Sequence, residues 1–586
     1  MPEKICRWRC LITDMEKETK GSKPIYTIRT EKDVPVPMRD GVRLAVDIFR
    51  PDADGKFPAL VAYGQYGKEL EELGLTFPPQ ARPSPLWDGA IEGGDTKYIV
   101  PRGYVHMVAD ARGTGKSEGE CCGFFGTGGD WEGKDCHDLI EWAAQQPWCD
   151  GNVGMVGISY LGAVQVLAAA EQPPHLKAIF VNGGHFDAYE WAYHGGIMWL
   201  MPRAALEGRG GDSGVAWNNV VSAALKKQGR EEFERRIQER LQDPDVRNYP
   251  NFIHMLHYPQ PHPQFIDWIV NPCDGPFYQE DSAISKADRI RIPVYLSVKW
   301  GRGWTVDGTI DCFQKVAGPR WLELQPMPPM QERPFHEFHD FMIRWYDHWL
   351  KGIDTGIAEQ PPIKLFVEGA DEWRYEEEWP LARTEWTRFY LRPRGLLKSE
   401  PEPLSVDSVP PDGFYQAPLT VTGDIQVLRY LSAPMTEDTE VTGPGALYLY
   451  ASIDTDDTNF LVKVNDIDPL GRRIPHTTGW LKASHREIDE GKSRPWRPFH
   501  PHTRAAPVPP GEIIHYAIRI YSMANVFKAG HRIELEIRSQ ETSDDPLTAL
   551  LPPDASHLPS GRATTHKIYR DKDHPSYLLL PVVPRK

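Results

Sequence analysis

A serine between a predicted strand and a predicted helix is the residue of this chain best placed to do chemistry. Ser159 lies in the run Gly154-Met-Val-Gly-Ile-Ser-Tyr-Leu-Gly162, which joins an apolar stretch to an alanine-rich one. A sharp turn at this point would lift the hydroxyl clear of the backbone, and N–H groups at the helix start could stabilise an oxyanion. The pattern predicts a nucleophilic serine, and the alternative is a serine that caps the following helix.

Strand and helix patterns alternate on both sides of this serine. The runs Phe57–Tyr63, Tyr104–Asp110 and Val153–Ile158 are typical of strands buried on both faces. Apolar residues recur at helical spacing between Asp130 and Gln146, and again from Leu161 to Ala170. Strands that alternate with helices indicate a parallel sheet covered on both faces, so the fold class is predicted to be α/β.

The pattern divides the chain into four segments. Residues 25–185 and 288–385 carry the α/β pattern and are predicted to form the two parts of one domain. Residues 186–287, rich in aromatic and charged residues, are predicted to be a helical insertion between two strands of the sheet. Residues 386–586 show strand periods only, which predicts a β-sandwich of the jelly-roll kind.

Composition excludes several classes of protein. The 586 residues are 40% hydrophobic and 25% charged, with a formal net charge of −16, so the chain is neither disordered nor suited to bind nucleic acid or an acidic membrane surface. No apolar run reaches the ~18–20 residues that span a bilayer, and the first residues lack the apolar core of a signal peptide. We therefore expect a cytoplasmic protein; a homo-oligomer stays open.

Metal and phosphate sites are not expected. The eight cysteines form no paired CxxC array, and the histidines show no HExxH or comparable ligand spacing. The run Gly113-Thr-Gly-Lys-Ser117 resembles the end of a phosphate-binding loop, but Asp110 stands where that motif needs its first glycine. The sequence therefore predicts no cofactor.

Several segments together resemble one family. The run Asp150–Gly162 is similar to the nucleophile segment of the cocaine-esterase/X-Pro dipeptidyl-peptidase family, and Met38–Asp47, Arg102–Gly113, Trp345–Gly352 and Ser522–Ile533 agree with it in order. The resemblance extends from about residue 30 to the end of the chain. It implies an α/β-hydrolase domain, a helical cap and a C-terminal jelly roll.

The resemblance also implies two oxyanion donors. One is the backbone N–H of Tyr160, directly after the nucleophile, and the other is the hydroxyl of Tyr66. A phenol with a pKa near 10 stays protonated at neutral pH, so it can donate to a developing negative charge. The alternative for Tyr66 is a tyrosine packed at a strand end.

Two turns depart from the family pattern. The family's catalytic acid lies in a Gly-Trp-x-Asp-Gly-like turn after the strand that corresponds to Val294–Val298, and here the matching position holds Arg302. The family's catalytic base lies in a Gly-Pro-Trp-x-His-like turn, and here that position holds Pro329. Arginine cannot orient an imidazolium and proline has no titratable group, so the usual triad is incomplete.

Nearby residues offer substitutes for the missing acid and base. Asp307 or Asp311 could serve as the acid, and His336 or His339 as the base, in the chain order Ser, Asp, His. The two histidines are three residues apart and would share one face of a helix. The alternative is that these are ordinary polar residues.

Three aromatic residues and one arginine are candidate substrate-binding residues. His185, Tyr189 and Trp191 follow a predicted strand into the insertion and could form a substrate wall, or else the aromatic core of the cap. Arg302, expected near the turn that carries Ser159, would favour a substrate with an anionic group, such as a carboxylate held by the guanidinium.

The predicted function is that of a serine hydrolase of the esterase, amidase or dipeptidyl-peptidase type. Ser159 would attack an acyl carbonyl of a small molecule, and water would release the acid from the acyl-enzyme. One alternative is a non-hydrolytic enzyme of the same fold, such as a lyase, cyclase or acyl transferase, because Arg302 and Pro329 replace the usual acid and base. A second alternative is an inactive binding protein. We expect weak or no activity on generic esters.

Overall fold

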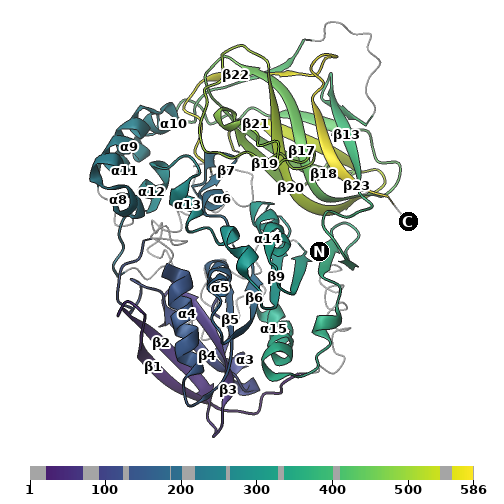
Figure 1. The fold of residues 1–586 in the computed structure, drawn as a ribbon. Helices are drawn as coiled ribbons and strands as arrows, with labels where there is room; N and C mark the ends of the chain where they lie inside the picture. The colour runs from purple at the N-terminus through teal and green to yellow at the C-terminus, as the bar shows by residue number, and fades with distance from the viewer. Residues whose placement is uncertain are drawn as a thin grey trace.

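The computed structural model describes residues 21–69, 92–122, 131–184, 186–200, 218–258, 264–301, 303–326, 335–399, 410–541 and 557–584. Figure 1 shows a purple-to-teal α/β domain below, a group of cap helices to one side, and a green-to-yellow β domain above.

A ten-stranded sheet forms the centre of the α/β domain. Its strand order is β1-β2-β4-β3-β5-β6-β9-β10-β11-β12, and the seven strands from β4 to β11 are parallel. The antiparallel strands β1, β2 and β12 lie at the two edges. The bounds are β1 (Ile28–Pro37), β2 (Arg43–Pro51), β3 (Phe57–Gly64), β4 (Val105–Asp110), β5 (Cys149–Ile158), β6 (Leu176–Asn182), β9 (Val294–Lys299), β10 (Arg320–Gln325), β11 (Ile363–Val367) and β12 (Glu372–Glu376).

Helices cover both faces of this sheet. The glycines Gly154 and Gly157 of β5 face opposite sides, because side-chain positions alternate along a strand. A Cβ atom on Gly157 would lie 2.3 Å from Cβ of Leu161 in α5 (Tyr160–Ala170), whereas one on Gly154 would lie 2.5 Å from Tyr346 in α15 (Phe335–Lys351). Helix α4 (Trp131–Ala144) packs beside α5, and α3 (Thr96–Ile99) lies against α15. The predicted α/β class is confirmed.

The cap follows β6 and consists mainly of short helices. Figure 1 shows α8 to α12 together at the side of the molecule, between the sheet and the β domain. The bounds are α6 (Ala188–Ala192), β7 (Tyr193–His194), β8 (Ile197–Met198), α8 (Ala223–Gln228), α9 (Arg230–Gln242), α10 (Pro244–Arg247), α11 (Pro250–His257), α12 (Gln264–Ile269) and α13 (Pro276–Gln279).

The C-terminal domain is built from strands with a core of its own. In the described part of residues 386–586 the regular elements are strands, apart from one short turn of 3-10 helix at Ala483–His485. Along β17, Leu447, Leu449 and Ala451 are fully buried while the residues between them are partly exposed, which is the predicted period of two. The bounds are β13 (Glu385–Arg392), β14 (Leu396–Lys398), β15 (Asp412–Gln416), β16 (Leu428–Ser432), β17 (Thr439–Ile453), β18 (Asn459–Ile467), β19 (Arg473–Lys482), β20 (Ile514–Phe527), β21 (Arg532–Arg538), β22 (Thr564–Tyr569) and β23 (Tyr577–Val583).

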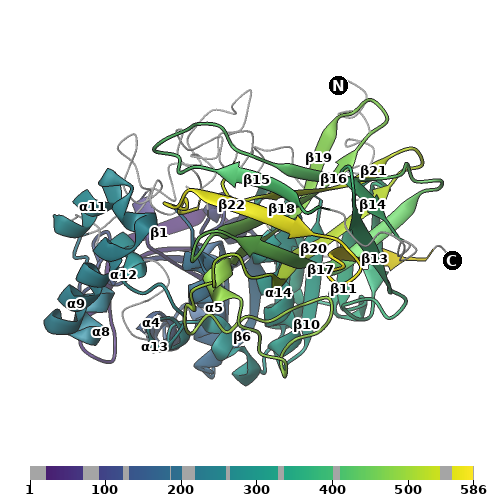
Figure 2. The ribbon, with the colours of Figure 1, turned by 90° about the horizontal axis from the view of Figure 1, so that it is seen from above.

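The C-terminal domain rests on the α/β domain through β20. Seen from above, β20 and β17 lie over α14 (Gly303–Lys315) (Figure 2), and α14 packs against β20. The backbone of Glu368, just after β11, exchanges hydrogen bonds of 3.0 and 2.8 Å with Ala524 and Val526 of β20. Helix α14 and the carboxyl end of β11 are therefore held against the β domain.

Candidate active site

Ser159 adopts the strained backbone of a nucleophile elbow. Its φ of 57° and ψ of −119° lie in a region that L-residues other than glycine rarely occupy. The side chain is partly exposed, and it makes no capping hydrogen bond to α5. Ser159 thus occupies the N-cap position of α5 without capping it through its hydroxyl, which stands at the carboxyl edge of the sheet.

Close packing explains the glycines around the elbow. A Cβ atom on Gly157 would collide with Leu161, and one on Gly162 would lie 3.2 Å from the carbonyl oxygen of Asn182. Glycine at both positions lets α5 begin directly against the ends of β5 and β6. The N–H of Ser159 donates to the Asn182 carbonyl at 2.9 Å, so this amide is already used. The Tyr160 amide starts α5, at the positive end of the helix dipole, and this position fits an oxyanion donor.

The fold brings Tyr66 to the same edge as Ser159. Tyr66 is half-buried and follows β3, which pairs with β5 in parallel. The end of β3 touches the start of α5, since a Cβ atom on Gly64 would lie 3.3 Å from Leu161. The carboxyl ends of neighbouring parallel strands meet at one edge of a sheet, where α/β proteins bind ligands. The oxyanion role of Tyr66 stays a prediction.

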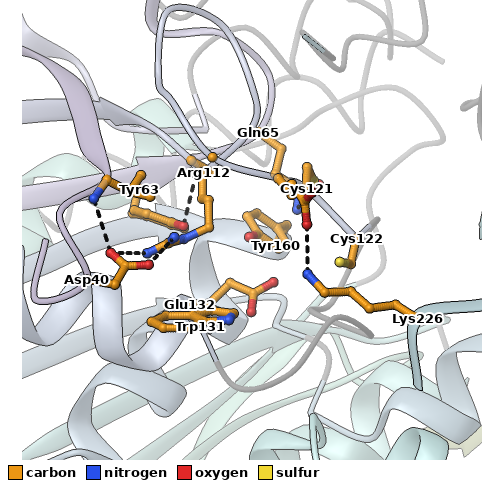
Figure 3. Close-up of a pocket in the computed structure, with 14 residues that line it drawn as sticks. Asp40, Tyr63, Gln65, Arg112, Cys121, Cys122, Trp131, Glu132, Tyr160 and Lys226 are labelled. Atoms are coloured by element: carbon orange, nitrogen blue, oxygen red, sulfur yellow. Dashed lines mark hydrogen bonds and ion pairs between the residues drawn. The ribbon is translucent and has the colours of Figure 1, made fainter. Parts of the chain in front are cut away.

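A cavity of about 270 Å³ lies beside the elbow, on the Tyr160 side. Figure 3 shows the Tyr160 ring and the Glu132 carboxylate between the Asp40–Arg112 pair on one side and Lys226 on the other. Gln65, next to Tyr66, lines the same cavity, whereas Ser159 is not among the described lining residues. The cavity therefore lies next to the elbow and is lined by Tyr160 and by Gln65, the neighbour of Tyr66.

Ion pairs neutralise most of the charges in this cavity. Arg112 donates to Asp40 at 2.7 Å and to Asp135 at 2.6 Å, and Lys226 pairs with Glu120 at 2.8 Å. Burial raises the pKa of the Cys122 thiol to about 11, so this cysteine is protonated at neutral pH and is a poor nucleophile.

Among the described residues that line this cavity, Tyr160 was predicted from the sequence as a site residue, and the others were not. Arg112 and Asp40 belong to the family-like segments Arg102–Gly113 and Met38–Asp47, and these were the available signals. Glu132 and Lys226 sit in ordinary helical patterns, 94 residues apart, so only the fold brings them together.

His339 lies in a buried contact with the segment around Asp95 and Tyr98. Its Nε2 accepts the backbone N–H of Asp95 at 3.1 Å, its ring packs against Tyr98, and it is 2% exposed. A neutral imidazole has one lone pair, and this hydrogen bond uses it. The contact therefore argues for a structural role of His339 and against its use as a base. The side chain of His336 lies outside the described residues.

Asp307 and Asp311 face the C-terminal domain. Asp307 accepts Arg519 at 2.7 Å and the N–H of Ser522 at 3.0 Å, and Asp311 forms an ion pair with Arg497. These contacts lie between α14 and the β domain, and no described histidine takes part in them. The structure thus gives both carboxylates a structural use at a domain contact.

Two of the candidate substrate-wall residues belong to aromatic clusters. Tyr189 stacks on Tyr193 at 5.2 Å and donates its hydroxyl to the Pro272 carbonyl, so it lies in the cap core. Trp191 packs edge-on against Trp304 of α14 at 5.3 Å. His185, Arg302 and Pro329 lie outside the described residues.

Within the described ranges, no three or more histidine, cysteine, aspartate or glutamate side chains are grouped so as to hold a metal ion. No helix in those ranges is both long and apolar enough to cross a membrane.

Strand order, elbow and β-rich C-terminal domain define the class of protein: an α/β-hydrolase with a cap and a C-terminal β domain. Solved structures agree. A CocE/NonD family hydrolase from Staphylococcus aureus superposes with a TM-score of 0.71 at 23% identity, covering 95% of this chain and 94% of that one. An α-amino acid ester hydrolase superposes with a TM-score of 0.70 at 18% identity, covering 95% and 96%.

Sequence comparisons identify the family. The model of the X-Pro dipeptidyl-peptidase (S15 family) matches residues 40–328, and that of the X-Pro dipeptidyl-peptidase C-terminal non-catalytic domain matches residues 355–579. The cocaine esterase of Rhodococcus sp. (strain MB1 Bresler) is 28% identical, over 94% of this chain and 98% of that protein. The chain belongs to the cocaine-esterase/X-Pro dipeptidyl-peptidase family of hydrolases.

Proposed function

We propose that this protein is a serine hydrolase that cleaves an ester or amide of a small acyl substrate through an acyl-enzyme on Ser159. The strained elbow carries the proposal, because it holds Ser159 at φ 57° with a hydroxyl that does not cap the helix. Strain of this kind persists where the surrounding structure fixes it and is common at functional sites.

The oxyanion would be held by two donors from neighbouring strands. The Tyr160 amide starts α5 next to the nucleophile, and the Tyr66 hydroxyl follows the adjacent strand β3. Donors fixed in advance stabilise the charge that develops on the carbonyl oxygen in the transition state. Removal of one such donor usually costs about 10²–10³ in kcat.

His336 is the candidate base that remains, since His339 is engaged by Asp95. In this proposal His336 takes the proton of the Ser159 hydroxyl, which is otherwise a weak nucleophile at neutral pH. Arg302 would bind a carboxylate of the substrate.

A second candidate is a non-hydrolytic reaction in the same site. The observation in its favour is that Asp307 and Asp311 are paired with arginines of the C-terminal domain, and that no histidine side chain in the described part of the chain contacts them. Without an oriented base, the pocket and oxyanion donors could still serve a lyase, cyclase or acyl-transfer step.

Hydrolysis of two p-nitrophenyl esters tests the proposal. The hemisuccinate ester carries a carboxylate for Arg302, and the acetate ester does not. We expect faster release of p-nitrophenol from the hemisuccinate, loss of the enzymatic rate in Ser159→Ala, and a kcat about 10²–10³ lower in Tyr66→Phe. Equal rates for wild type and Ser159→Ala on both esters would refute the hydrolytic proposal and favour the second candidate.

A further inference from the structure

The turn that carries Tyr66 rests on buried charged side chains that take no part in the proposed chemistry. Lys68 is 2% exposed, Asp47 of β2 is fully buried, and Asp110 at the end of β4 is 2% exposed. Burying charged groups costs free energy unless they are paired and hydrogen-bonded, so the partners of these three residues show what the arrangement holds in place.

One carboxylate joins two loops. Oδ1 of Asp110 accepts the N–H of Lys68 at 2.7 Å, and Oδ2 accepts the N–H of Lys116 at 2.9 Å. The turn after β3 is thereby tied to the loop after β4. Gly115 allows the second contact, because a Cβ atom there would lie 2.1 Å from Oδ2 of Asp110.

Lys68 is held at both ends. Its backbone N–H donates to Asp110, and its Nζ lies 3.0 Å from Oδ1 of Asp47. On the other side of the turn, the carbonyl of Gly64 accepts the N–H of Ala111 at 2.7 Å. Tyr66 lies between Gly64 and Lys68, so both ends of its turn are fixed to β4 and β2.

We propose that Asp110 and Lys68 are positioning residues that set the Tyr66 hydroxyl for oxyanion donation. The inference rests on the proposed function, since it assumes that Tyr66 is a donor. An oxyanion donor must sit within a fraction of an ångström of its place, and such precision comes from side chains behind the site. Neither residue touches the substrate; each acts through the backbone of the turn.

The test measures the second-order rate constant for labelling of Ser159 by a fluorophosphonate, whose phosphoryl oxygen occupies the oxyanion site. We compare wild type, Tyr66→Phe, Asp110→Asn and the double variant. Asn keeps the size of Asp110, but its NH₂ group would face a backbone N–H and lose one of the two hydrogen bonds. We expect labelling to fall about 10²–10³-fold in Tyr66→Phe. We expect at least a tenfold fall in Asp110→Asn, with no further loss when it is added to Tyr66→Phe.

Lys68→Met is a second, independent variant. It keeps the backbone bond to Asp110 and leaves Asp47 paired with Lys32 at 2.9 Å, so folding should survive. It should also slow labelling only when Tyr66 is present. The matched control is Asp138→Asn, which removes a partly buried ion pair with Arg39 on the same domain and should label at the wild-type rate.

The outcomes separate this inference from the proposed function. Wild-type labelling rates in Asp110→Asn and Lys68→Met, with slow labelling in Tyr66→Phe, would overturn the positioning role alone. Equal losses with and without the Tyr66 hydroxyl would also overturn it, because they indicate a general structural role. Wild-type labelling in Tyr66→Phe would remove the donor on which the inference rests, and no labelling in wild type would refute the proposed function itself.

Discussion

Arg519 of β20 joins the C-terminal domain to two carboxylates outside it, and its replacement gives the sharpest test of the domain contact. Arg519 donates to Asp307 of α14 at 2.7 and 3.1 Å and to Glu190 of α6 at 3.2 Å. Asp307 is 3% exposed. In Arg519→Met, the buried Asp307 and the partly buried Glu190 would both lose this cation.

The expected loss is large for a single substitution. Removal of one partner from a buried ion pair costs about 3–5 kcal/mol, because the remaining charge stays desolvated. For a domain of about 200 residues, each kcal/mol shifts Tm by about 2–4 °C, so the transition of the C-terminal domain should fall by about 6–20 °C. The matched control is Arg504→Met on the same domain, whose exposed pair with Glu487 should contribute under about 1 kcal/mol.

The loss should also depend on pH. Burial raises the pKa of Glu190 to about 7 from its ordinary 4.5, although Arg519 opposes the rise. The folded state therefore holds more protons than the unfolded state between about pH 4.5 and 7, and stability falls as pH increases through that window. Without Arg519 the pKa rises further, so the variant should lose more at pH 8 than at pH 5.

Differential scanning calorimetry at pH 5 and pH 8 measures both effects. A Tm within 1–2 °C of wild type at pH 8, or the same loss as in Arg504→Met, would refute the reasoning that the Arg519 contacts are buried and uncompensated. An equal loss of Tm at both pH values would refute the expectation that Glu190 titrates between them.

Three further predictions concern single sites. Glu190→Gln should raise stability over wild type at pH 8 by up to about 3 kcal/mol, with the gain vanishing near pH 5, as measured by Tm against pH; a pH-independent difference would contradict it. Gly157→Ala should disrupt the elbow, since its Cβ would meet Leu161 at 2.3 Å, and should abolish hydrolysis even where circular dichroism shows a folded protein; wild-type kcat would contradict it. His336→Ala should abolish labelling of Ser159 while His339→Ala keeps it, and the reverse result would show that the Asp95 contact does not hold His339 in solution.

The sequence predicted the parts of the fold that depend on local periodicity. The apolar run Val153–Ile158 followed by a helix at Leu161 corresponds to β5 and α5, and the strand-only pattern after residue 386 corresponds to the β-rich domain. These predictions succeeded because strand and helix periods are set by neighbouring residues.

The contacts of the site join residues that lie far apart in the chain, and a single sequence does not show which distant residues will meet. Asp307 looked like a candidate acid because it follows the expected turn, yet its partner Arg519 lies 212 residues away. His339 is engaged by Asp95 at a separation of 244 residues. Asp110 was noted as part of a family-like segment and as the residue that spoils a phosphate-binding motif. Its role as a bridge between two loops appears only when both loops are in place.

The nucleophilic role of Ser159 is the central claim, and one measurement tests it directly. The purified full chain is treated with a fluorophosphonate probe, and the mass of the intact protein and of its labelled peptide is determined for wild type and Ser159→Ala. We expect one probe per wild-type chain, attached to Ser159, and none on Ser159→Ala. A wild-type chain that stays unlabelled at Ser159, or a Ser159→Ala chain that labels as well as wild type, would contradict it.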